Sequence, residues 1–327
     1  MNGKADYPRT LQQAIQYFSD EQVAIDEMAS LRWPDGVRCV ACESNNLRWM
    51  AKPRRWKCRE CGRQFSVKLG TVMEDSPIPL TKWMPALWLL SNCKNGVSSW
   101  EVHRALGVTQ KTAWFMLHRL RMALSGIKFG YSKIGGPESI CEADETFVGG
   151  KVGNMSKSRR KEMAGSGGGR RNKTVVIGVL DRDANKVRTE IIPFAGRDYM
   201  QKMVRKNVKF GSTIFTDEHI GYHGLANRYT HEAVNHMVEY VRGRVHTQGI
   251  ENFWSLLKRQ LHGTYIAVEP FHLHRYCDEQ VFRYENRNTK QRPMNDADRF
   301  RLALSQVAHK RLTYAELTGK NDATTPF

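Results

Sequence analysis

The sequence predicts a multidomain α/β protein in which a small metal-binding ribbon and a helical region precede a mixed β-sheet. Two C-x-x-C pairs near the amino terminus predict the ribbon. Apolar residues at helical spacing over about 80–126 predict the helices, and β-rich runs from about residue 138 predict the sheet. The 327 residues are long enough for two or three domains, at least one with a sizeable core.

Changes of pattern along the chain set the expected domain boundaries. The amino-terminal part is expected to hold one helix over about residues 10–31, and the last part holds another apolar-periodic run, RFRLALSQVAHKRL. The segments are a helical segment at 1–35, the ribbon at 36–68, a helix-turn-helix region at 80–126, the sheet domain at 136–290, and a helical tail at 291–327.

The charge balance predicts a polyanionic partner. Lys and Arg number 51 against 33 Asp and Glu, which gives a formal net charge of +18. Neutralising phosphates releases counterions, so such an excess favours nucleic acid. A ribosome-like RNA-binding protein or a membrane-directed basic patch has the same composition. No run of about 18 apolar residues and no signal-peptide pattern is present, so we expect no membrane association and a reducing, cytoplasmic setting.

The four cysteines Cys39, Cys42, Cys58 and Cys61 predict one structural zinc ion. They form two C-x-x-C pairs with fifteen residues between them. Each pair fits a tight knuckle, and two knuckles complete a tetrahedral thiolate shell. A disulfide pair is the alternative, and the reducing setting argues against it. Four thiolates leave no open coordination position, so the site is structural rather than catalytic.

The helix-turn-helix region is predicted from a helix, a turn at residues 107–109, and a second helix through Leu124. Ser98 or Ser99 can cap the first helix, and Thr109 can cap the second. A plain helical hairpin has the same pattern, although the neighbouring ribbon and the net charge favour DNA binding. The residues that then lead the second helix, where groove contacts are made, are Gln110, Lys111 and Thr112.

Residues 151–173 are predicted to form a basic loop. The stretch is too rich in Gly, Ser, Lys and Arg to pack into a core. It is either a solvated loop or a segment that orders on a phosphate backbone. In the second case the DNA contacts would come from Arg159, Arg160, Arg170 and Arg171.

The order of elements after residue 138 predicts a ribonuclease-H-like sheet. Three β-rich runs, ESICEAD, KTVVIGVLDR and KVRTEIIP, come in sequence, and the last two form a hairpin around residues 183–185. A short helix near 197–205, the strand STIFTD and a helix over about 250–261 follow. In this order, one strand ends in an acid and the last helix carries another.

Asp144, Asp217 and Glu251 are the candidate metal ligands of this domain. Mg²⁺ is usually held by a few carboxylates together with substrate phosphates. Alternation in a strand places Glu142 and Asp144 on one face. Each acid also has an ordinary explanation, as a turn residue or as a partner of a helix dipole. Asn252 is a competing ligand beside Glu251, just as Glu218 is beside Asp217.

At this point the sequence resembles a known family. DETFVGGK, TDEHIGYHGL and HTQGIENFWSLLKRQLHGTY look like the core of bacterial insertion-sequence DDE transposases of the Merlin-related, ISXO-like group. The segment CVAC to WKCRECGRQFSVKLGTVMEDSPIPLTKW resembles the zinc ribbon that precedes that core in many members. The resemblance covers about residues 18–290.

The resemblance implies a catalytic site and its partners. It makes Asp144, Asp217 and Glu251 the metal-binding triad, assisted by Lys258 on the same helix. The implied cofactors are two Mg²⁺ or Mn²⁺ ions per active site, which would support two-metal cleavage and transfer of DNA strands. The implied partners are double-stranded DNA, at the terminal inverted repeats and at the target, and at least one further copy of the chain. The implied location is the nucleoid in the bacterial cytoplasm.

Two other functional classes share parts of the pattern. One is a non-catalytic DNA-binding regulator, built from the ribbon and the helix-turn-helix. The other is a structure-specific nuclease of the ribonuclease-H class. Metal-dependent cleavage of element-end DNA separates the first class from a transposase, and joined DNA products separate the second.

Overall fold

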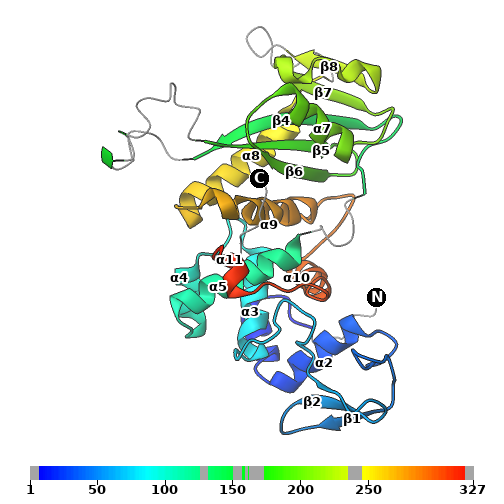
Figure 1. Cartoon of the computed structure of the whole chain (residues 1–327), viewed down its shortest axis with the longest axis vertical. Coiled ribbons are helices and arrows are strands. Elements are labelled where there is room, and N and C mark those ends of the chain that lie inside the picture. The colour runs from blue at the N-terminus through cyan, green and yellow to red at the C-terminus, as the bar shows by residue number, and fades with distance from the viewer. Residues whose placement is uncertain are drawn as a thin grey trace. The chain divides into compact units, whose positions relative to one another are not determined.

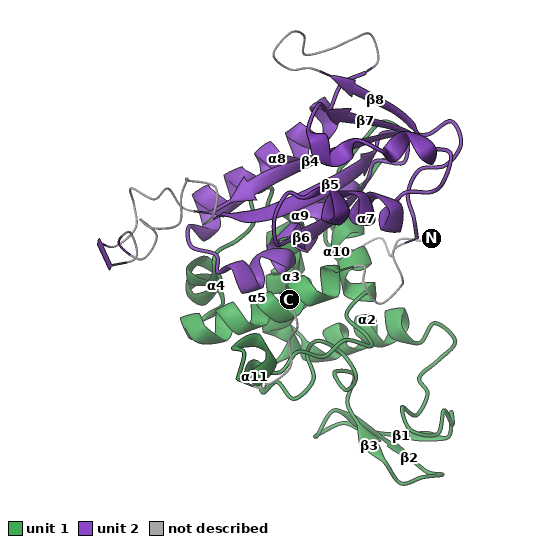
Figure 2. Ribbon diagram, turned by 45° about the horizontal axis from the view of Figure 1, so that its top comes forward, with its two compact units in different colours: residues 1–128, 286–326 green, residues 129–285, 327 purple. Residues whose placement is uncertain are grey.

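The chain forms two compact units, which we describe separately (Figure 2). Unit 1 consists of Met1–Lys128 together with Asn286–Pro326, and unit 2 of Phe129–Glu285. Unit 2 is therefore an insertion in the sequence of unit 1. The computed structural model describes residues 7–125, 132–149, 157–158, 161, 173–234 and 245–320.

The ribbon of unit 1 is a three-stranded antiparallel sheet in the order β1-β2-β3, formed by Leu47–Met50, Arg55–Cys58 and Gln64–Phe65. Trp49 pairs with Trp56, and Trp56 pairs with Phe65, so aromatic side chains occupy one face. The alternate residues Arg48, Arg55 and Lys57 are exposed on the opposite face, which we call the basic face. The sheet is thus amphipathic, with a packed aromatic side and a charged side.

The rest of unit 1 is helical (Figure 1). Its helices are α1 (Leu11–Tyr17), α2 (Glu21–Arg32), α3 (Leu80–Asn92), α4 (Ser99–Leu106), α5 (Gln110–Leu124), α10 (Asp296–Ser305) and α11 (Tyr314–Leu317). The single helix expected over residues 10–31 is wrong. The helix is interrupted there. Phe18 ends α1, and the Asp20 carboxylate accepts the Gln22 N–H and so caps a second helix, α2.

The predicted helix pair α4 and α5 is present with the expected caps. Ser98 forms a capping box with Glu101, and the Thr109 hydroxyl caps α5. Gly107 ends α4 with φ 59°, a left-handed conformation that favours glycine. Beyond its first turns α5 is largely buried, so only its amino-terminal end is open to solvent.

The carboxy-terminal segment completes the core of unit 1. The Phe300 ring of α10 packs against Phe18 and Trp88, with centroid distances of 5.5 and 5.2 Å. The buried Lys310 ammonium donates to the carbonyl oxygens of Ala123 and Ser125, which end α5. The ends of the sequence therefore share one core.

Unit 2 is built on a mixed five-stranded sheet in the order β6-β5-β4-β7-β8. Its strands are β4 (Ile140–Val148), β5 (Thr174–Asp181), β6 (Lys186–Ile192), β7 (Thr213–Asp217) and β8 (Thr230–Val234). The first three are antiparallel, which confirms the predicted hairpin between β5 and β6. β7 and β8 run parallel to β4. This mixed sheet is compatible with the expected ribonuclease-H-like domain.

Helices cover both faces of this sheet. On one face, α7 (Arg197–Asn207) packs on Ala143, Ile177 and Val179. On the other face, α8 (Gln248–Gln260) and α9 (Leu273–Glu285) cover Val176 and Leu180. The short helices of unit 2 are the 3₁₀ turns Ile220–Tyr222, Leu225–Asn227 and Pro270–His272, and the π turn Leu261–Tyr265.

The predicted apolar stripe of α8 is confirmed. Its residues Ile250, Phe253, Trp254, Leu257 and Leu261 are all buried in the core between α8 and the sheet. Among the described residues, no helix combines the length and apolar character needed to cross a membrane.

Candidate active site and zinc centre

The four ribbon cysteines form a cluster with the dimensions of a zinc site. Their Sγ atoms all lie within 4.8 Å of one another, with 3.6 Å between Cys39 and Cys61 and between Cys42 and Cys58. Zn–S bonds of about 2.3 Å in a tetrahedron place sulfurs about 3.8 Å apart. A disulfide needs about 2.05 Å, so the spacing fits a metal shell and not a bridge. The donor set is that of structural zinc.

Two matching knuckles prepare these thiols for a metal. The Cys39 N–H donates to the Ser44 carbonyl and the Cys58 N–H to the Arg63 carbonyl, each at 2.9 Å. The residue after each second cysteine has a positive φ, 58° at Glu43 and 73° at Gly62. The backbone N–H of Ala41 lowers the pKa of Cys39 to about 6, and that of Cys61 lowers the pKa of Cys58. Thiolate, the form that binds zinc, is therefore favoured at the first cysteine of each knuckle. In the metal-free cluster the neighbouring thiols and burial raise the pKa of Cys42 to about 12.

Asp144 and Asp217 come from adjacent parallel strands. β4 and β7 pair with Glu142 opposite Phe215. This is the last pair of the register, and Asp144 and Asp217 each lie two residues beyond it, on the face of the sheet that Glu142 and Phe215 share. Both are partly buried.

Helix α8 carries Glu251 to the same face of the sheet as Asp144. Gly178 is the β5 partner of Asp144, and a Cβ atom there would lie 2.7 Å from the Trp254 ring. The missing side chain therefore lets α8 approach the sheet beside Asp144. The Glu251 carboxylate accepts the hydroxyl of Thr247 at 2.8 Å.

The electrostatics of Asp144 show that acids converge here. Burial, and then the charges of Glu145, Asp217 and Glu251, raise the pKa of Asp144 to about 8. Among the described residues, only the cysteine quartet has all its ligand atoms within 4.8 Å, so the carboxylates are more widely spaced than the thiols. Carboxylates that repel one another in this way form a set of oxygen donors that a divalent cation would stabilise.

Glu251 lies on the exposed side of α8, together with two further polar residues. Asn252 and Lys258 are both exposed. The charge of Glu251 is the last of the causes that raise the pKa of Asp144, so its carboxylate lies near that acid. Lys258 is seven residues after Glu251, about 10 Å further along the helix axis.

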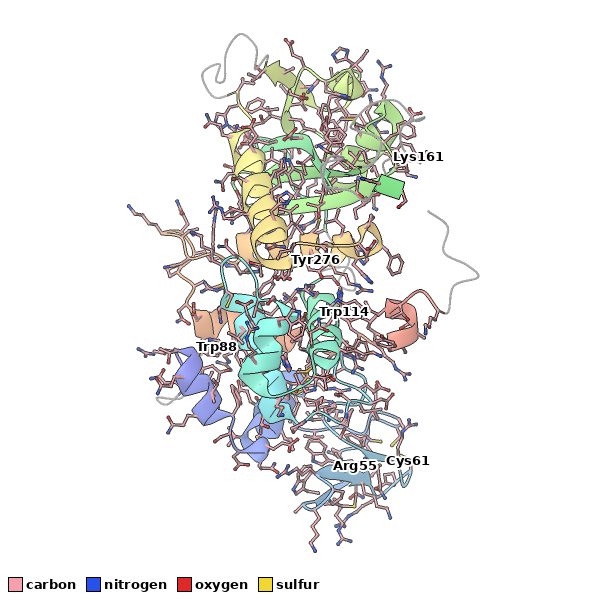
Figure 3. The ribbon with its side chains drawn as sticks, turned by 90° about the vertical axis from the view of Figure 1, so that its left-hand side faces the viewer. Arg55, Cys61, Trp88, Trp114, Lys161 and Tyr276 are labelled. Atoms are coloured by element: carbon pink, nitrogen blue, oxygen red, sulfur yellow. The ribbon has the colours of Figure 1, made fainter. Side chains whose placement is uncertain are left out.

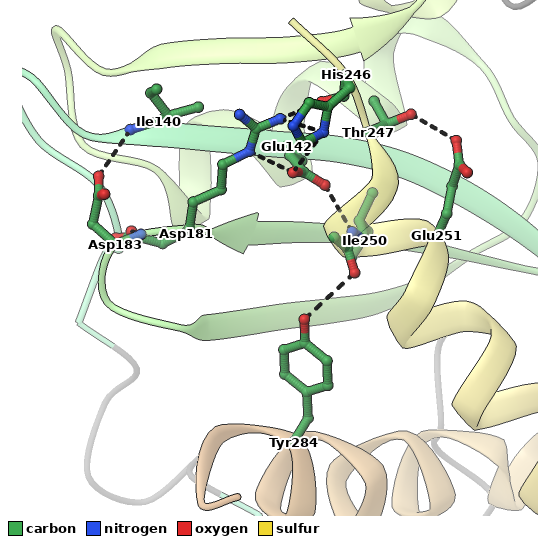
Figure 4. A network of polar contacts seen from close by, with 11 residues as sticks. Ile140, Glu142, Asp181, Asp183, His246, Thr247, Ile250, Glu251 and Tyr284 are labelled. Carbon is green, nitrogen blue, oxygen red and sulfur yellow. Dashed lines mark hydrogen bonds and ion pairs between the residues drawn. The ribbon is translucent and has the colours of Figure 1, made fainter. Parts of the chain in front are cut away.

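Sequence reasoning placed Glu142 on the face of Asp144 but gave it no role. Its carboxylate is 1% exposed, forms an ion pair with Arg182, and accepts the backbone N–H of Ile250 at 2.7 Å (Figure 4). Arg182 also donates to the carbonyl oxygen of His246 at 2.6 Å. A charged residue at a core-facing position of a strand was the available signal, because buried acids need partners.

Glu145 is a further acid, on the opposite face of β4. The buried Tyr222 hydroxyl donates to it at 3.0 Å. Burial, and then the charge of Asp217, raise the pKa of Glu145. The backbone N–H of His219 donates to Asp217 at 3.1 Å, within the turn that follows β7.

The predicted groove-contacting residues on α5 already make contacts within unit 1. The Gln110 amide donates to the Ser99 hydroxyl at 2.8 Å, and the Lys111 ammonium lies 4.9 Å from the centre of the Tyr314 ring. The Thr112 N–H donates to Thr109. The four predicted loop arginines, Arg159, Arg160, Arg170 and Arg171, lie outside the described residues.

Two known proteins are similar to this chain in sequence. A protein of Halobacterium salinarum, named as an uncharacterized protein in transposable element ISH50, is 27% identical over 258 residues, spanning 76% of this chain and 85% of the relative. An uncharacterized transposase-like protein of Haemophilus influenzae is 27% identical over 106 residues, spanning 32% of this chain and 85% of the relative.

Family models match the ribbon and the sheet separately. The transposase zinc-ribbon domain matches residues 19–64, and the ISXO2-like transposase domain matches residues 135–285. The second match spans β4 through α9, and so includes all three candidate acids. Residues 135–285 of this chain therefore form an ISXO2-like transposase domain, preceded in the sequence by a transposase zinc ribbon.

Proposed function

We propose that this chain is a DDE-type transposase that binds the terminal inverted repeats of an insertion sequence, cleaves the DNA there and transfers the freed strand to target DNA. Asp144, Asp217 and Glu251 are its metal-binding triad. The observation that carries the proposal is the match to a transposase domain, which contains all three acids. Asp144 lies on the face of the sheet that α8 covers, and Asp217 ends the neighbouring strand.

The three carboxylates fit Mg²⁺ or Mn²⁺, two per site. When bound, such ions neutralise charge on the scissile phosphate and activate the attacking oxygen. The protein would contribute the partly buried Asp144, within the central strand β4, and Asp217, at the end of the neighbouring β7. The exposed Glu251 on α8 would be the third ligand, and the exposed Lys258 would bind a DNA phosphate.

Charge supports duplex DNA as the partner. Residues 36–68 hold nine Lys and Arg against two acids. The basic face of Arg48, Arg55 and Lys57 is exposed, and Arg55 lies on the ribbon with Cys61 (Figure 3). This surface would bind the phosphate backbone, while the residues that lead α5 would read the groove. The four loop arginines are further proposed DNA contacts.

A reaction that joins two element ends to one target favours a complex in which each end is held by its own copy of the chain. We therefore propose that the active complex holds at least two copies of the chain and acts on chromosomal DNA, in the bacterial nucleoid.

Cleavage and joining assays on element-end DNA test this function. The wild-type chain is expected to nick the DNA and to form joined products with Mg²⁺ or Mn²⁺. Asp217→Asn removes a ligand charge, so it should abolish both steps while leaving DNA binding unchanged. Mg²⁺-dependent nicking by the Asp217→Asn protein would sink the assignment, and cleavage without joined products would identify a nuclease instead.

A further inference from the structure

We propose that Glu142 is a positioning residue for Glu251, an inference that rests on the proposed function. Its buried carboxylate caps α8 from the neighbouring strand and sets how α8 lies along the sheet. The contact that does this joins residues 108 positions apart in the sequence.

Helix α8 starts without a cap of its own. Its N-cap residue, Thr247, makes no side-chain capping bond, and its hydroxyl donates to Glu251 instead. The free N–H of Ile250, in the first turn, donates to Glu142 Oε2 at 2.7 Å. An N-cap side chain normally accepts this bond, so Glu142 takes that role from β4. A carboxylate also interacts favourably with the positive end of the helix dipole.

Arg182 and His246 hold this carboxylate in place. Arg182, directly after β5, forms an ion pair with Glu142 and donates to both Nδ1 and the carbonyl oxygen of His246. His246 lies just before α8, so the network joins β4, the end of β5 and the start of α8 (Figure 4). Glu142 is 1% exposed, and its charge is therefore paired as a buried charge must be.

Gly249 leaves room for the carboxylate. A Cβ atom at this position would lie 2.9 Å from Glu142 Oε2 and 3.0 Å from Oε1. Glycine ordinarily weakens a helix, and here it allows the cap to reach the backbone. The Tyr284 hydroxyl contacts the Gly249 carbonyl oxygen at 3.4 Å, which adds a further contact to the same turn.

This anchor fixes Glu251 relative to Asp144. Glu142 is two residues before Asp144 on the same face of β4, and Glu251 directly follows the anchored Ile250. A helix that slips by one residue moves about 1.5 Å and turns by about 100°. Misplacement of about 1 Å near reacting groups can cost about a hundredfold in rate. The cap therefore controls whether the third acid reaches the other two.

The test is Glu142→Gln, which keeps the side-chain shape but removes the charge that Arg182 holds. We expect the affinity of the metal-free protein for Mn²⁺, measured by calorimetry, to fall by about 10- to 100-fold, as for other residues that orient metal ligands. Element-end DNA affinity should not change, and high Mn²⁺ should partly restore cleavage. Hydrogen exchange at the Ile250 amide should become faster.

Glu279→Gln is the matched control. Glu279 is also a fully buried acid of unit 2 paired with an arginine, Arg283, but it lies on α9. This variant should lower thermal stability and leave Mn²⁺ affinity at the wild-type value. Equal losses of Mn²⁺ affinity in the two variants would overturn the inference, because Glu142 would then be only a stabilising buried charge.

Gly249→Ala keeps every charge and is the variant to use if Glu142→Gln does not fold. Its methyl group displaces the carboxylate, so the same loss of Mn²⁺ affinity is expected. In a Glu251→Gln background, Glu142→Gln should cause no further loss, because coupled residues are not additive. Additive losses would overturn the inference. Absence of Mn²⁺ binding and cleavage in the wild-type protein would instead overturn the proposed function.

Discussion

Asp144 holds its proton near neutral pH in the metal-free protein, because burial and the neighbouring Glu145, Asp217 and Glu251 raise its pKa to about 8. The cost of bringing these acids together is relieved when a cation binds. A metal must displace this proton, so metal affinity is linked to pH.

The sign of this linkage gives a prediction for stability. An unfolded aspartate releases its proton near pH 3.9, so between about pH 4 and 8 the folded chain binds more protons than the unfolded chain. Asp144 therefore contributes to the free energy of unfolding of the metal-free protein below about pH 4. This contribution is lost as the pH rises through about 8. Chemical denaturation across this range should show the loss in the wild type.

The matched protein for that measurement is Asp144→Asn, in which this proton is absent. Its stability should depend less on pH over the same window, and Mn²⁺ affinity in the wild type should rise from about pH 6 to 8. Identical pH profiles of stability for the two proteins would mean that Asp144 is ionised throughout.

The sequence alone predicts a role for some of these acids but not for others. Asp217 was predicted at a strand end and does end β7. Asp144 was also predicted at a strand end, which is wrong, because β4 continues to Val148 and Asp144 lies within this central strand. Glu251 was predicted because it borders an apolar helical stripe. Glu142 could be assigned to a face but not to a partner. Its bond to Ile250 spans 108 positions, and periodicity carries no information about such contacts.

At the scale of elements, the contact of α8 with the sheet depends on one glycine. A methyl group at Gly178 would lie 2.7 Å from Trp254, in a fully packed core. We expect Gly178→Ala to destabilise unit 2 by about 1–3 kcal/mol, because overpacking forces side chains off their rotamers. Denaturant unfolding measures this.

Gly263→Ala provides the comparison, because a Cβ atom there has nothing within 4 Å. It should change the free energy of unfolding by less than about 0.5 kcal/mol. If the two substitutions change the free energy of unfolding equally, the side chain at position 178 does not determine how closely α8 packs on the sheet.

The ribbon gives the second prediction at this scale. Replacing Arg48, Arg55 and Lys57 together by alanine removes the basic face but none of the cysteines. DNA affinity should fall for all sequences alike, and the slope of log K against log salt should drop by about 0.9 for each phosphate that the variant no longer neutralises. Filter binding at several salt concentrations measures both quantities.

Zinc content should stay at the wild-type value in this triple variant. The control is Arg54→Ala, because Arg54 is already paired with Glu21 and so contributes less free charge to DNA. An unchanged salt slope in the triple variant would remove the basic face from the DNA interface.

At the scale of the molecule, the units should respond separately to core mutations. Phe300 is fully buried and packs on Phe18 and Trp88 in unit 1, and Phe253 is fully buried in unit 2. Phe300→Ala should destabilise unit 1 by about 3–5 kcal/mol, and Phe253→Ala should do the same to unit 2. Calorimetry should show which of the two unfolding transitions shifts to lower temperature in each variant. If both transitions shift together in either variant, the two units do not unfold independently.

The order of the domains along the chain could be predicted from the sequence, but the packing of the carboxy-terminal helix against the amino-terminal helices could not. The strand order followed from β-rich runs and their turns, because those signals are local. The run RFRLALSQV showed that a helix with an apolar face exists. Its partner α3 is about 200 positions away, as the bond from Asn92 to the Asp296 carbonyl spans 204, and no periodic pattern identifies such a pair.

The insertion of unit 2 has a consequence for the order of synthesis. Chains leave the ribosome from the amino terminus at about 5–20 residues per second, so about ten to thirty seconds separate residue 128 from residue 286. During that time Phe18 and Trp88 have no Phe300 to cover them. The transposase domain can therefore fold on the nascent chain before the ribbon-bearing unit is complete, and only a fully translated chain has both.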